Sequence, residues 1–187
     1  YYDDSFEVLP YDPDKARNLL EESGWDSSQT LLYKINSGDP TLVQGVNVIA
    51  QQLADVGIQV DIQTLDIGNL LIDAAAGDYD LFTVQYTLAP VDPYPDMMWL
   101  VGGEEGDNWP RYHNDELSEL IEDTQATEDV DELVDIYRQI DELLQEEVPV
   151  LSTYVISGLG AVSKRLENAV PDVYGTFLNM HEWTVAE

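Results

Sequence analysis

The chain has 187 residues, 44% of them apolar, which supports one domain or one large lobe and excludes a disordered chain. It carries 38 acidic against 7 basic residues, a formal net charge of −31. Nucleic acid is excluded as a partner because phosphate binding needs Lys and Arg. The acids are spread over every segment, which we interpret as adaptation to multimolar salt, the alternative being an acidic protein of ordinary salinity. Cysteine is absent, which excludes disulfides and thiolate metal sites.

The first half of the chain alternates predicted helices and strands. Each helix is expected to begin at an Asp cap and to end at a glycine. The helices run from Asp12 to Gly24, from Asp39 to Gly57 and from Asp66 to Gly77. Strands are predicted over Thr30–Ile35, Ile58–Ile62 and Asp80–Tyr86. This alternation predicts an α/β fold, with helices on both faces of the sheet.

A long segment from Thr87 to Tyr112 then breaks the pattern. Its prolines predict a loop, and its aromatic residues argue against disorder. Ligands of α/β sheets lie at the carboxyl ends of the strands, and this loop leaves from such an end. We therefore predict solute-binding residues here and after the first strand, whereas Trp99 is interpreted as core. The candidates are Tyr86, Asp92, Tyr94, Trp109, Tyr112, Ser37 and Asp39.

The second half predicts two helices and a strand. Asn114 caps the first helix, and the second runs from Val130 to Leu144 and stops at Pro149. Val150–Ile156 is predicted as a strand, and the remaining tail as short strands and turns. No internal repeat, signal peptide or apolar span long enough for a membrane is recognised in these residues.

No catalytic constellation is found, so no catalytic residue, metal ligand or cofactor is predicted. His113 and His181 are isolated, and nucleophile elbows, zinc-binding pairs and phosphate loops are missing from the sequence. Paired carboxylates occur by chance in so acidic a chain, so they support a carboxylate-dependent hydrolase only weakly. A surface interaction protein that works through its acidic face is the third hypothesis. We expect a binding module and not an enzyme.

Segments along nearly the whole chain resemble the family-five solute-binding proteins, the dipeptide- and oligopeptide-binding proteins of ABC importers. The order and spacing of these segments carry the resemblance. They are Tyr11–Trp25, Ile49–Val60, Gly77–Tyr86, Asp92-Pro93, Tyr112–Leu120, Asp131–Pro149 and Val162–Val170.

This resemblance implies the C-terminal lobe of a two-lobed, type II periplasmic-binding-protein-like fold, with a mixed sheet. Residues 1–158 are then the second lobe, and residues 159–187 are a return segment that packs on a first, N-terminal lobe. The implied partners are a small-molecule or peptide solute, that first lobe and an ABC permease. The implied location is extracellular, at the cell surface, with an anchor in the N-terminal part. Such a protein closes around its solute, so one lobe alone is expected to bind weakly.

One departure concerns the peptide label. Peptide binders of this family carry an acid shortly after the strand that here ends at Tyr86, and this acid holds the amino terminus of the peptide. By simple counting, Ala89 stands at that position. Asp92 replaces it if the loop is shifted. Otherwise the resemblance implies a solute without a free amine, such as a sugar oligomer or a metal chelate.

Overall fold

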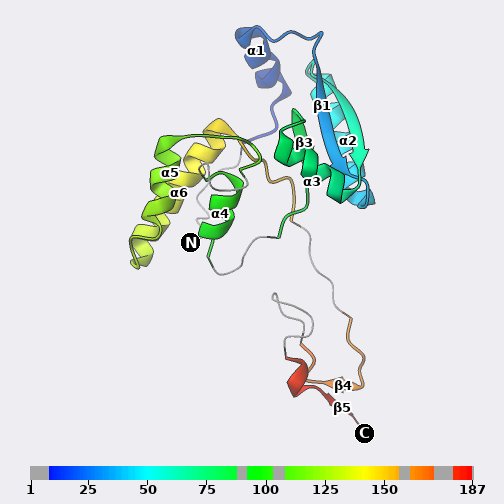
Figure 1. The fold of residues 1–187 in the computed structure, drawn as a ribbon, viewed down its shortest axis with the longest axis vertical. Helices are drawn as coiled ribbons and strands as arrows, with labels where there is room; N and C mark the ends of the chain where they lie inside the picture. Colours follow the sequence, from blue (N-terminus) through cyan, green and yellow to red (C-terminus); the bar gives the residue numbers. More distant parts are fainter. Residues whose placement is uncertain (1–8, 88–91, 103–107, 156–160, 171–178, 187) are drawn as a thin grey trace. The chain divides into compact units, whose positions relative to one another are not determined.

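The computed structural model describes residues 9–87, 92–102, 108–155, 161–170 and 179–186 (Figure 1). The chain divides into two compact units. The first comprises Tyr1–Ala89 and Pro93–Val150, and the second comprises Pro90–Asp92 and Leu151–Glu187. Each unit is described by itself.

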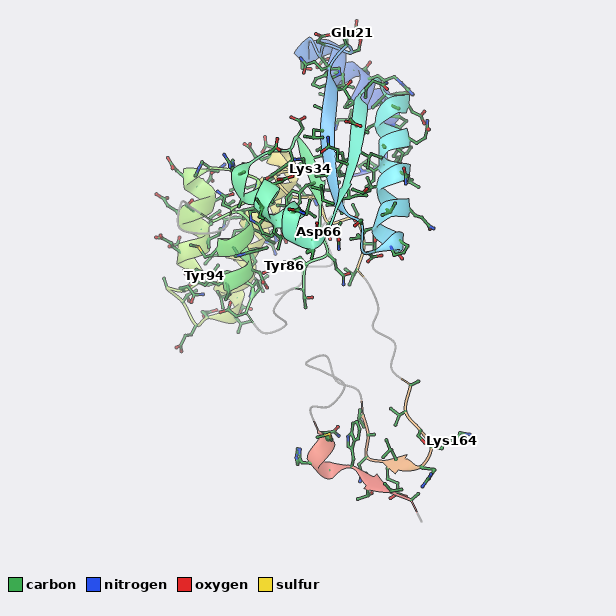
Figure 2. All side chains as sticks on the ribbon, turned by 45° about the vertical axis from the view of Figure 1, so that its right-hand side comes forward. Glu21, Lys34, Asp66, Tyr86, Tyr94 and Lys164 are labelled. Atoms are coloured by element: carbon green, nitrogen blue, oxygen red, sulfur yellow. The ribbon has the colours of Figure 1, made fainter. Side chains whose placement is uncertain are left out.

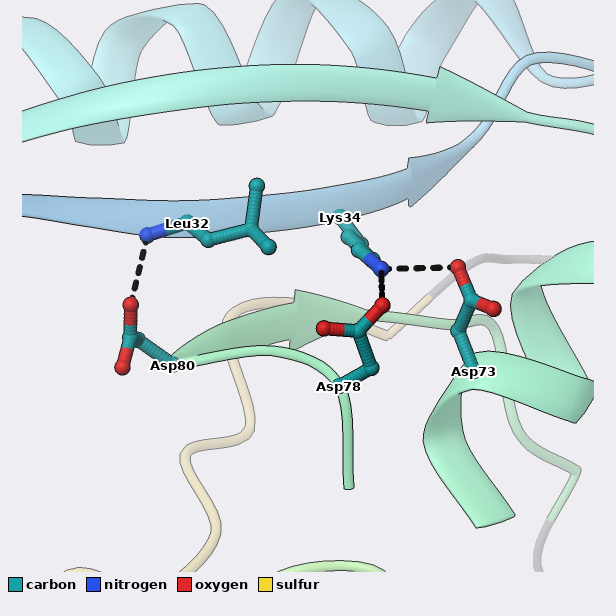
Figure 3. Close-up of polar contacts among 5 residues, drawn as sticks. All are labelled: Leu32, Lys34, Asp73, Asp78 and Asp80. Atoms are coloured by element: carbon teal, nitrogen blue, oxygen red, sulfur yellow. Dashed lines mark hydrogen bonds and ion pairs between the residues drawn. The ribbon is translucent and has the colours of Figure 1, made fainter. Parts of the chain in front are cut away.

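A parallel sheet of three strands organises the first unit. The strands are β1 (Thr30–Asn36), β2 (Gln59–Leu65) and β3 (Leu81–Thr83), in the order β2-β1-β3. The helix α2 (Pro40–Asp55) joins β1 to β2, and α3 (Ile67–Ala76) joins β2 to β3. Because these two crossovers run in opposite directions across the sheet, right-handed connections place α2 and α3 on opposite faces. Figure 3 shows the two helices on the two sides of the strands, as predicted. The described strand pairings of this sheet are all parallel, whereas a mixed sheet was expected.

The alternation of side chains along β1 explains its two faces. Tyr33 and Ile35 are buried with Val46 of α2, and apolar residues of α2, β2 and β3 surround them. Lys34 points to the other face and pairs with Asp73 of α3. Each face of the central strand is therefore covered by its own helix.

Aspartate caps begin the first three helices of this unit at the predicted positions. Asp12 accepts a hydrogen bond from the Lys15 backbone N–H at the start of α1 (Pro13–Ser23). Asp39 and Asp66 cap α2 and α3 in the same way. Such caps contribute about 0.5–2 kcal/mol each, because they satisfy N–H groups that have no partner within the helix.

Three helices complete the unit: α4 (Tyr94–Leu100), α5 (Asp115–Asp123) and α6 (Val130–Glu147). Leu117 and Ile121 of α5 are buried against Leu133, Ile136 and Ile140 of α6. Apolar residues of α4 pack against the same cluster. The amphipathic stripe of the long helix therefore forms the second core of the unit.

Three sequence predictions need correction. The segment Thr87–Tyr112 contains the helix α4, because Pro95 is compatible with a first helical turn and the apolar residues Met97 and Leu100 find a core to pack against. The third strand is shorter than predicted, since β1 ends soon after the pairing of Ile35 with Thr83. Residues 150–155, the described part of the predicted strand Val150–Ile156, form no ladder with a described strand.

The second unit is built on a short antiparallel pair, β4 (Leu166–Glu167) and β5 (Thr184–Val185), preceded at β5 by a 3-10 turn at Met180–Glu182. Trp183 donates from Nε1 to Asn179 at 2.8 Å, and Asn179 in turn donates to the Asn168 carbonyl. Short strands and turns are thus found in the tail, as predicted. No helix in the described part of the chain combines the length and apolarity that a bilayer crossing requires.

Candidate functional site

The carboxyl ends of β1 and β3 lie side by side because the two strands are parallel neighbours. Ser37 follows β1 and is exposed, and its backbone N–H donates to the Leu65 carbonyl at 2.7 Å. The Asp39 carboxylate accepts from the N–H groups of Thr41 and Leu42 at 2.8 and 3.3 Å. Asp39 therefore serves the start of α2, and Ser37 is the freer of the two candidates for solute contact.

Tyr86 lies beyond the end of β3 and is 37% exposed (labelled in Figure 2). Its hydroxyl donates to Asp96 Oδ1 at 2.8 Å, and its ring stacks on Trp99 with centroids 4.6 Å apart and planes 14° apart. Asp96 is 7% exposed. Burial, followed by the hydrogen bond and the charge of Asp96, raises the pKa of Tyr86 to about 12, so the phenol stays protonated at physiological pH.

Tyr86 is one end of a continuous line of rings, which we call the aromatic row. Trp99 meets Trp109 edge to face at 4.4 Å, and Trp109 meets Phe82 at 5.4 Å. Phe82 contacts Tyr79 at 4.8 Å, and the Tyr79 hydroxyl donates to the Trp109 carbonyl. Each such pair contributes about 0.5–1.5 kcal/mol beyond the burial of its surface. The row thus joins the strand end to α4 and to the segment before α5.

Two other predicted site residues lie in the helical core instead. Tyr94, labelled in Figure 2, and Tyr112 both pack against the cluster formed by α5 and α6. The backbone of Tyr112 is held by Asn108, which accepts from its N–H at 3.2 Å and donates to its carbonyl at 2.8 Å. These contacts are those of structural residues.

Asp92 is exposed and falls in the second unit, so it is described apart from the aromatic row. Ala89, which stands at the position of the acid in peptide binders of the family, lies outside the described residues. The position of an acid in this loop therefore stays a sequence prediction.

Sequence reasoning missed Asp96, Phe82 and Tyr79 and assigned Trp99 to the core. Trp99 is partly buried and packs between Tyr86 and Trp109 in the aromatic row. The signal that could have found it is the helix start at Pro95. Asp96 and Trp99 are three residues apart, which places both on one face of a helix.

A cluster of charged residues lies on the α3 face of the sheet (Figure 3). Lys34, 3% exposed, places Nζ 2.7 Å from Asp73 and 2.8 Å from Asp78. The hydrogen bond to Asp73 first, and then that to Asp78, raises the pKa of Lys34. Asp80 accepts from the backbone N–H of Leu32 at 2.7 Å. This cluster attaches α3 and the start of β3 to β1, a structural role.

Catalytic chemistry finds little support in the described residues. Hydrogen bonds lower the pKa of Asp26 and of Asp66, whereas a carboxylate-dependent hydrolase needs one carboxyl group with a raised pKa. His181 is exposed and lies 3.7 Å from Glu182. Groups of three or more side chains suited to a metal ion do not occur in the part of the chain that the structure describes.

Comparison with known proteins places the chain among binding proteins. The family profile of bacterial extracellular solute-binding proteins, family 5 Middle, matches residues 1–108. Di/tripeptide-binding protein 4 of Pseudomonas aeruginosa is 28% identical over 155 residues, which are 79% of this chain and 29% of that protein. The chain thus spans about a third or less of the length of the curated relatives it matches.

Solved structures show the same fold. The oligopeptide-binding protein AppA of Bacillus subtilis, in complex with a nonapeptide, matches with a TM-score of 0.78 and 20% identity, over 100% of this chain and 40% of that one. NikZ of Campylobacter jejuni, in complex with Ni(L-His), matches with a TM-score of 0.76 and 18% identity, over 96% and 40%. The relatives are solute-binding proteins and not enzymes, which agrees with the sequence prediction. The chain therefore belongs to family 5 of the bacterial extracellular solute-binding proteins, as its sequence resemblance predicted.

Proposed function

We propose that the chain is the C-terminal lobe of a solute-binding protein that captures di- or oligopeptides for an ABC importer. Residues 1–158 form this lobe, and residues 159–187 return to a first, N-terminal lobe. The family match and the similarity to a di/tripeptide-binding protein support this proposal. The protein works outside the cell, at the surface, with its anchor in the N-terminal part.

The observation that carries the proposal is the partial exposure of Tyr86 beyond the carboxyl end of β3. Ligands of open α/β sheets bind outside such strand ends, and aromatic rings give large contact areas for peptides and other flat groups. In this proposal Tyr86 and Trp109 contact the solute, with Ser37 as a polar partner. Asp92, in the second unit, is a separate polar candidate. Tyr94 and Tyr112 serve the packing of the helical cluster, and Asp39 serves the start of α2.

A metal chelate is the alternative solute. The structural match to NikZ, which was solved with Ni(L-His), favours it at the level of the fold. A sugar oligomer is the third class, since sugars also stack on aromatic rings. The three solute classes are compared in the same experiment, with each class titrated separately.

The test is intrinsic tryptophan fluorescence of the chain joined to its first lobe, because Trp99 and Trp109 lie in the aromatic row. Short peptides, oligosaccharides and nickel–histidine are titrated in multimolar KCl. We expect a saturable shift with peptides that is lost in Tyr86→Leu and kept in Tyr11→Leu, a change at a 73% exposed tyrosine. A shift with sugars or the chelate alone would replace the peptide label, and no shift with any arm would overturn the proposal.

We also propose that the chain is adapted to high salt. At a net charge of −31, self-repulsion opposes the compact state, and the Debye length falls from about 10 Å at 0.1 M to about 3 Å at 1 M salt. The midpoint of thermal unfolding is expected to rise steeply between 0.1 and 2 M KCl. A midpoint that stays constant over this range would contradict the adaptation.

A further inference from the structure

The helix α3 has more apolar surface than the sheet covers. Its buried residues, Leu70 and Ala74, are four positions apart and mark the side that packs on the sheet. Large apolar residues continue around the helix away from that side and are exposed, Ile72 to 66%. A helix that is apolar over most of its surface is normally covered on more than one side. We call this exposed surface the outer face of α3; it comprises Ile67, Gly68, Leu71, Ile72 and Ala75.

The helix on the opposite face of the sheet has a polar outer side instead. The exposed side chains of α2 are mostly amides, and Val48 is its exposed large apolar residue. Amide side chains hydrogen-bond to water, so this side of α2 needs no protein partner. The amides are those of Gln44, Asn47, Gln51 and Gln52. An exposed apolar face therefore distinguishes α3 from α2, and Val48 supplies a matched position for control variants.

The charges around α3 are locally balanced, in contrast to the net charge of −31 of the whole chain. Lys34 pairs with Asp73 within the helix and with Asp78 just beyond its end. Arg111 is exposed, and its guanidinium group donates to the Ala75 carbonyl near the end of the helix. Two of the 7 basic residues of the chain thus contact α3 or the residues that follow it. A second chain of the same high negative charge is repelled less here than at a purely acidic surface.

The two ends of α3 carry opposite charges. The exposed carboxylate of Asp66 caps the start of the helix, and the guanidinium group of Arg111 lies beside Gly77 at its end. Two copies of α3 that pack antiparallel bring Arg111 of each copy close to Asp66 of the other. Because such a pairing is symmetric, both contacts form at once. The charges at the helix ends are therefore complementary to those of a second copy.

The same antiparallel arrangement matches the apolar residues of the outer face. Leu71 and Ile72 lie midway between Asp66 and Gly77, so each meets its own counterpart across the two-fold axis. Gly68 then lies opposite the partner's Ala75. Small residues at these two positions allow the helices to approach closely, toward the short end of the usual interaxial distance of about 8–10 Å.

We propose that the outer face of α3 is the interface of a symmetric dimer, in which α3 packs antiparallel against α3 of a second copy of the chain. One short helix per copy buries less surface than the roughly 1,200–2,000 Å² of a standard stable interface, so the dimer is weak and forms at micromolar or higher concentrations. Salt strengthens it, because screening reduces the repulsion between two chains of net charge −31. The dimer does not depend on which solute is bound.

Sedimentation equilibrium tests this dimer without any solute. The 187-residue chain is measured from about 0.1 M to multimolar KCl, over salt concentrations at which circular dichroism shows it to be folded. We expect a monomer–dimer equilibrium whose association constant rises with salt, with no larger species, because a symmetric pair of identical faces is closed. A folded chain that stays monomeric at all salt concentrations would overturn the proposal.

Two matched variants locate the interface. Ile72→Glu places like charges on both sides of the two-fold axis and is expected to weaken dimerisation at least about tenfold. Val48→Glu adds the same charge at a residue of similar exposure, 58%, on the opposite face of the sheet, and should leave the dimer unchanged. Equal effects of the two changes, or a dimer that persists in Ile72→Glu, would place the contact elsewhere and overturn the proposal.

Disulfide crosslinking tests the antiparallel geometry, since the chain has no cysteine of its own. Ile72→Cys is expected to form a crosslinked dimer on mild oxidation in multimolar KCl, whereas Val48→Cys should not, because a disulfide requires Cα atoms within about 7 Å. The same oxidation is carried out on Ile72→Cys in the chain joined to its first lobe. Crosslinking there supports the dimer, whereas crosslinking that occurs only in the separate chain would assign the outer face of α3 to contact with that lobe and overturn the proposal.

Discussion

The ammonium group of Lys34 on β1 lies 2.7 Å from the carboxylate of Asp73 on α3 (Figure 3). Lys34 is 3% exposed, and its second partner, Asp78, lies just after the end of α3. The charge of a lysine buried in this way has to be paired with carboxylates, because an unpaired buried charge is strongly unfavourable. The ion pair therefore joins the central strand to the helix that crosses its face.

Removal of Lys34 should destabilise the fold more than removal of either partner. Lys34→Met removes both ion pairs at once, whereas each Asp→Asn change leaves Lys34 one carboxylate partner. Of the two partners, Asp78 has the more exposed side chain, 67% against 29% for Asp73, so its pair contributes less. We expect the unfolding midpoint to fall in the order Lys34→Met, Asp73→Asn, Asp78→Asn, from the largest to the smallest loss. Thermal unfolding followed by circular dichroism measures this order, and an equal loss in all three variants would contradict it.

The same pair makes a signed pH prediction. The pKa of Lys34 is raised above 10.5 by its carboxylate partners, so the folded state holds this proton more tightly than the unfolded state. Its stabilising contribution is complete below pH 10.5 and is lost as the pH rises through the folded pKa. The free energy of unfolding should therefore fall less steeply with rising pH in Lys34→Met than in the parent chain over this alkaline range. Urea unfolding at several pH values measures this, and the same slope in both chains would argue against the ion pair.

The elements that were predicted correctly are those with local signals. The caps at Asp12, Asp39 and Asp66, followed by apolar stripes, begin helices where expected. The helix α4 was missed because its stability comes from packing on α5 and α6 rather than from a local cap, and Pro93 makes no side-chain cap hydrogen bond. Tertiary contacts of this kind leave no periodic pattern in a seven-residue helix.

The surroundings of the candidate site could be predicted only in part, for the same reason. A position at the end of a strand makes Tyr86 a candidate, since the carboxyl edge of the sheet follows from the order of elements. The partners of Tyr86 come from α4, ten and thirteen residues further on, and such tertiary contacts leave no local signal in the sequence. Tyr94 and Tyr112 share the composition signal of Trp109 but pack on a different core.

Tyr86 should titrate abnormally at alkaline pH. Its pKa of about 12 has burial as the first cause, and the hydrogen bond and charge of Asp96 as the second and third. Asp96→Asn removes the charge but leaves the burial, so we expect the pKa of Tyr86 to fall part of the way toward 10. Spectrophotometric titration of tyrosinate, with Tyr86→Phe to identify the signal, measures this shift, and an unchanged pKa in Asp96→Asn would show that burial alone raises it.

Because the folded pKa of Tyr86 lies above its ordinary value, the unfolded state loses this proton first as the pH rises. Folding stability should therefore decrease between about pH 10 and 12. Tyr86→Phe removes this contribution, while Tyr33 and Tyr79, whose pKa values are also raised by burial, continue to act in the same direction. The variant should lose less stability than the parent chain over this range.

The aromatic row should stabilise the first unit independently of any solute. Trp109 contacts Trp99 and Phe82, so Trp109→Leu is expected to lower the free energy of unfolding by about 1–3 kcal/mol. Trp109→Phe keeps an aromatic ring at this position and should lose less. Urea unfolding measures both variants, and an unchanged stability in Trp109→Leu would mean that Trp109 serves solute contact rather than packing.

Two glycines with nearly the same backbone angle provide the sharpest test of the contact between α3 and the segment before α5. Gly24 and Gly77 end α1 and α3 with φ of +70° and +71°. A Cβ on Gly24 would meet nothing within 4 Å, whereas a Cβ on Gly77 would lie 2.4 Å from the guanidinium carbon of Arg111. Gly24→Ala should therefore cost about 1–2 kcal/mol, the ordinary penalty of a left-handed residue with a side chain.

Gly77→Ala incurs the same penalty and also displaces Arg111, which loses its hydrogen bond to the Ala75 carbonyl. We expect a larger loss of stability than in Gly24→Ala, and we expect the excess to vanish when Arg111→Ala is combined with Gly77→Ala. A double-mutant cycle by urea unfolding isolates this coupling, since the two residues are in direct contact. If the two glycine variants lose equal stability in the presence of Arg111, the guanidinium group moves aside freely and does not hold α3 to the rest of the unit.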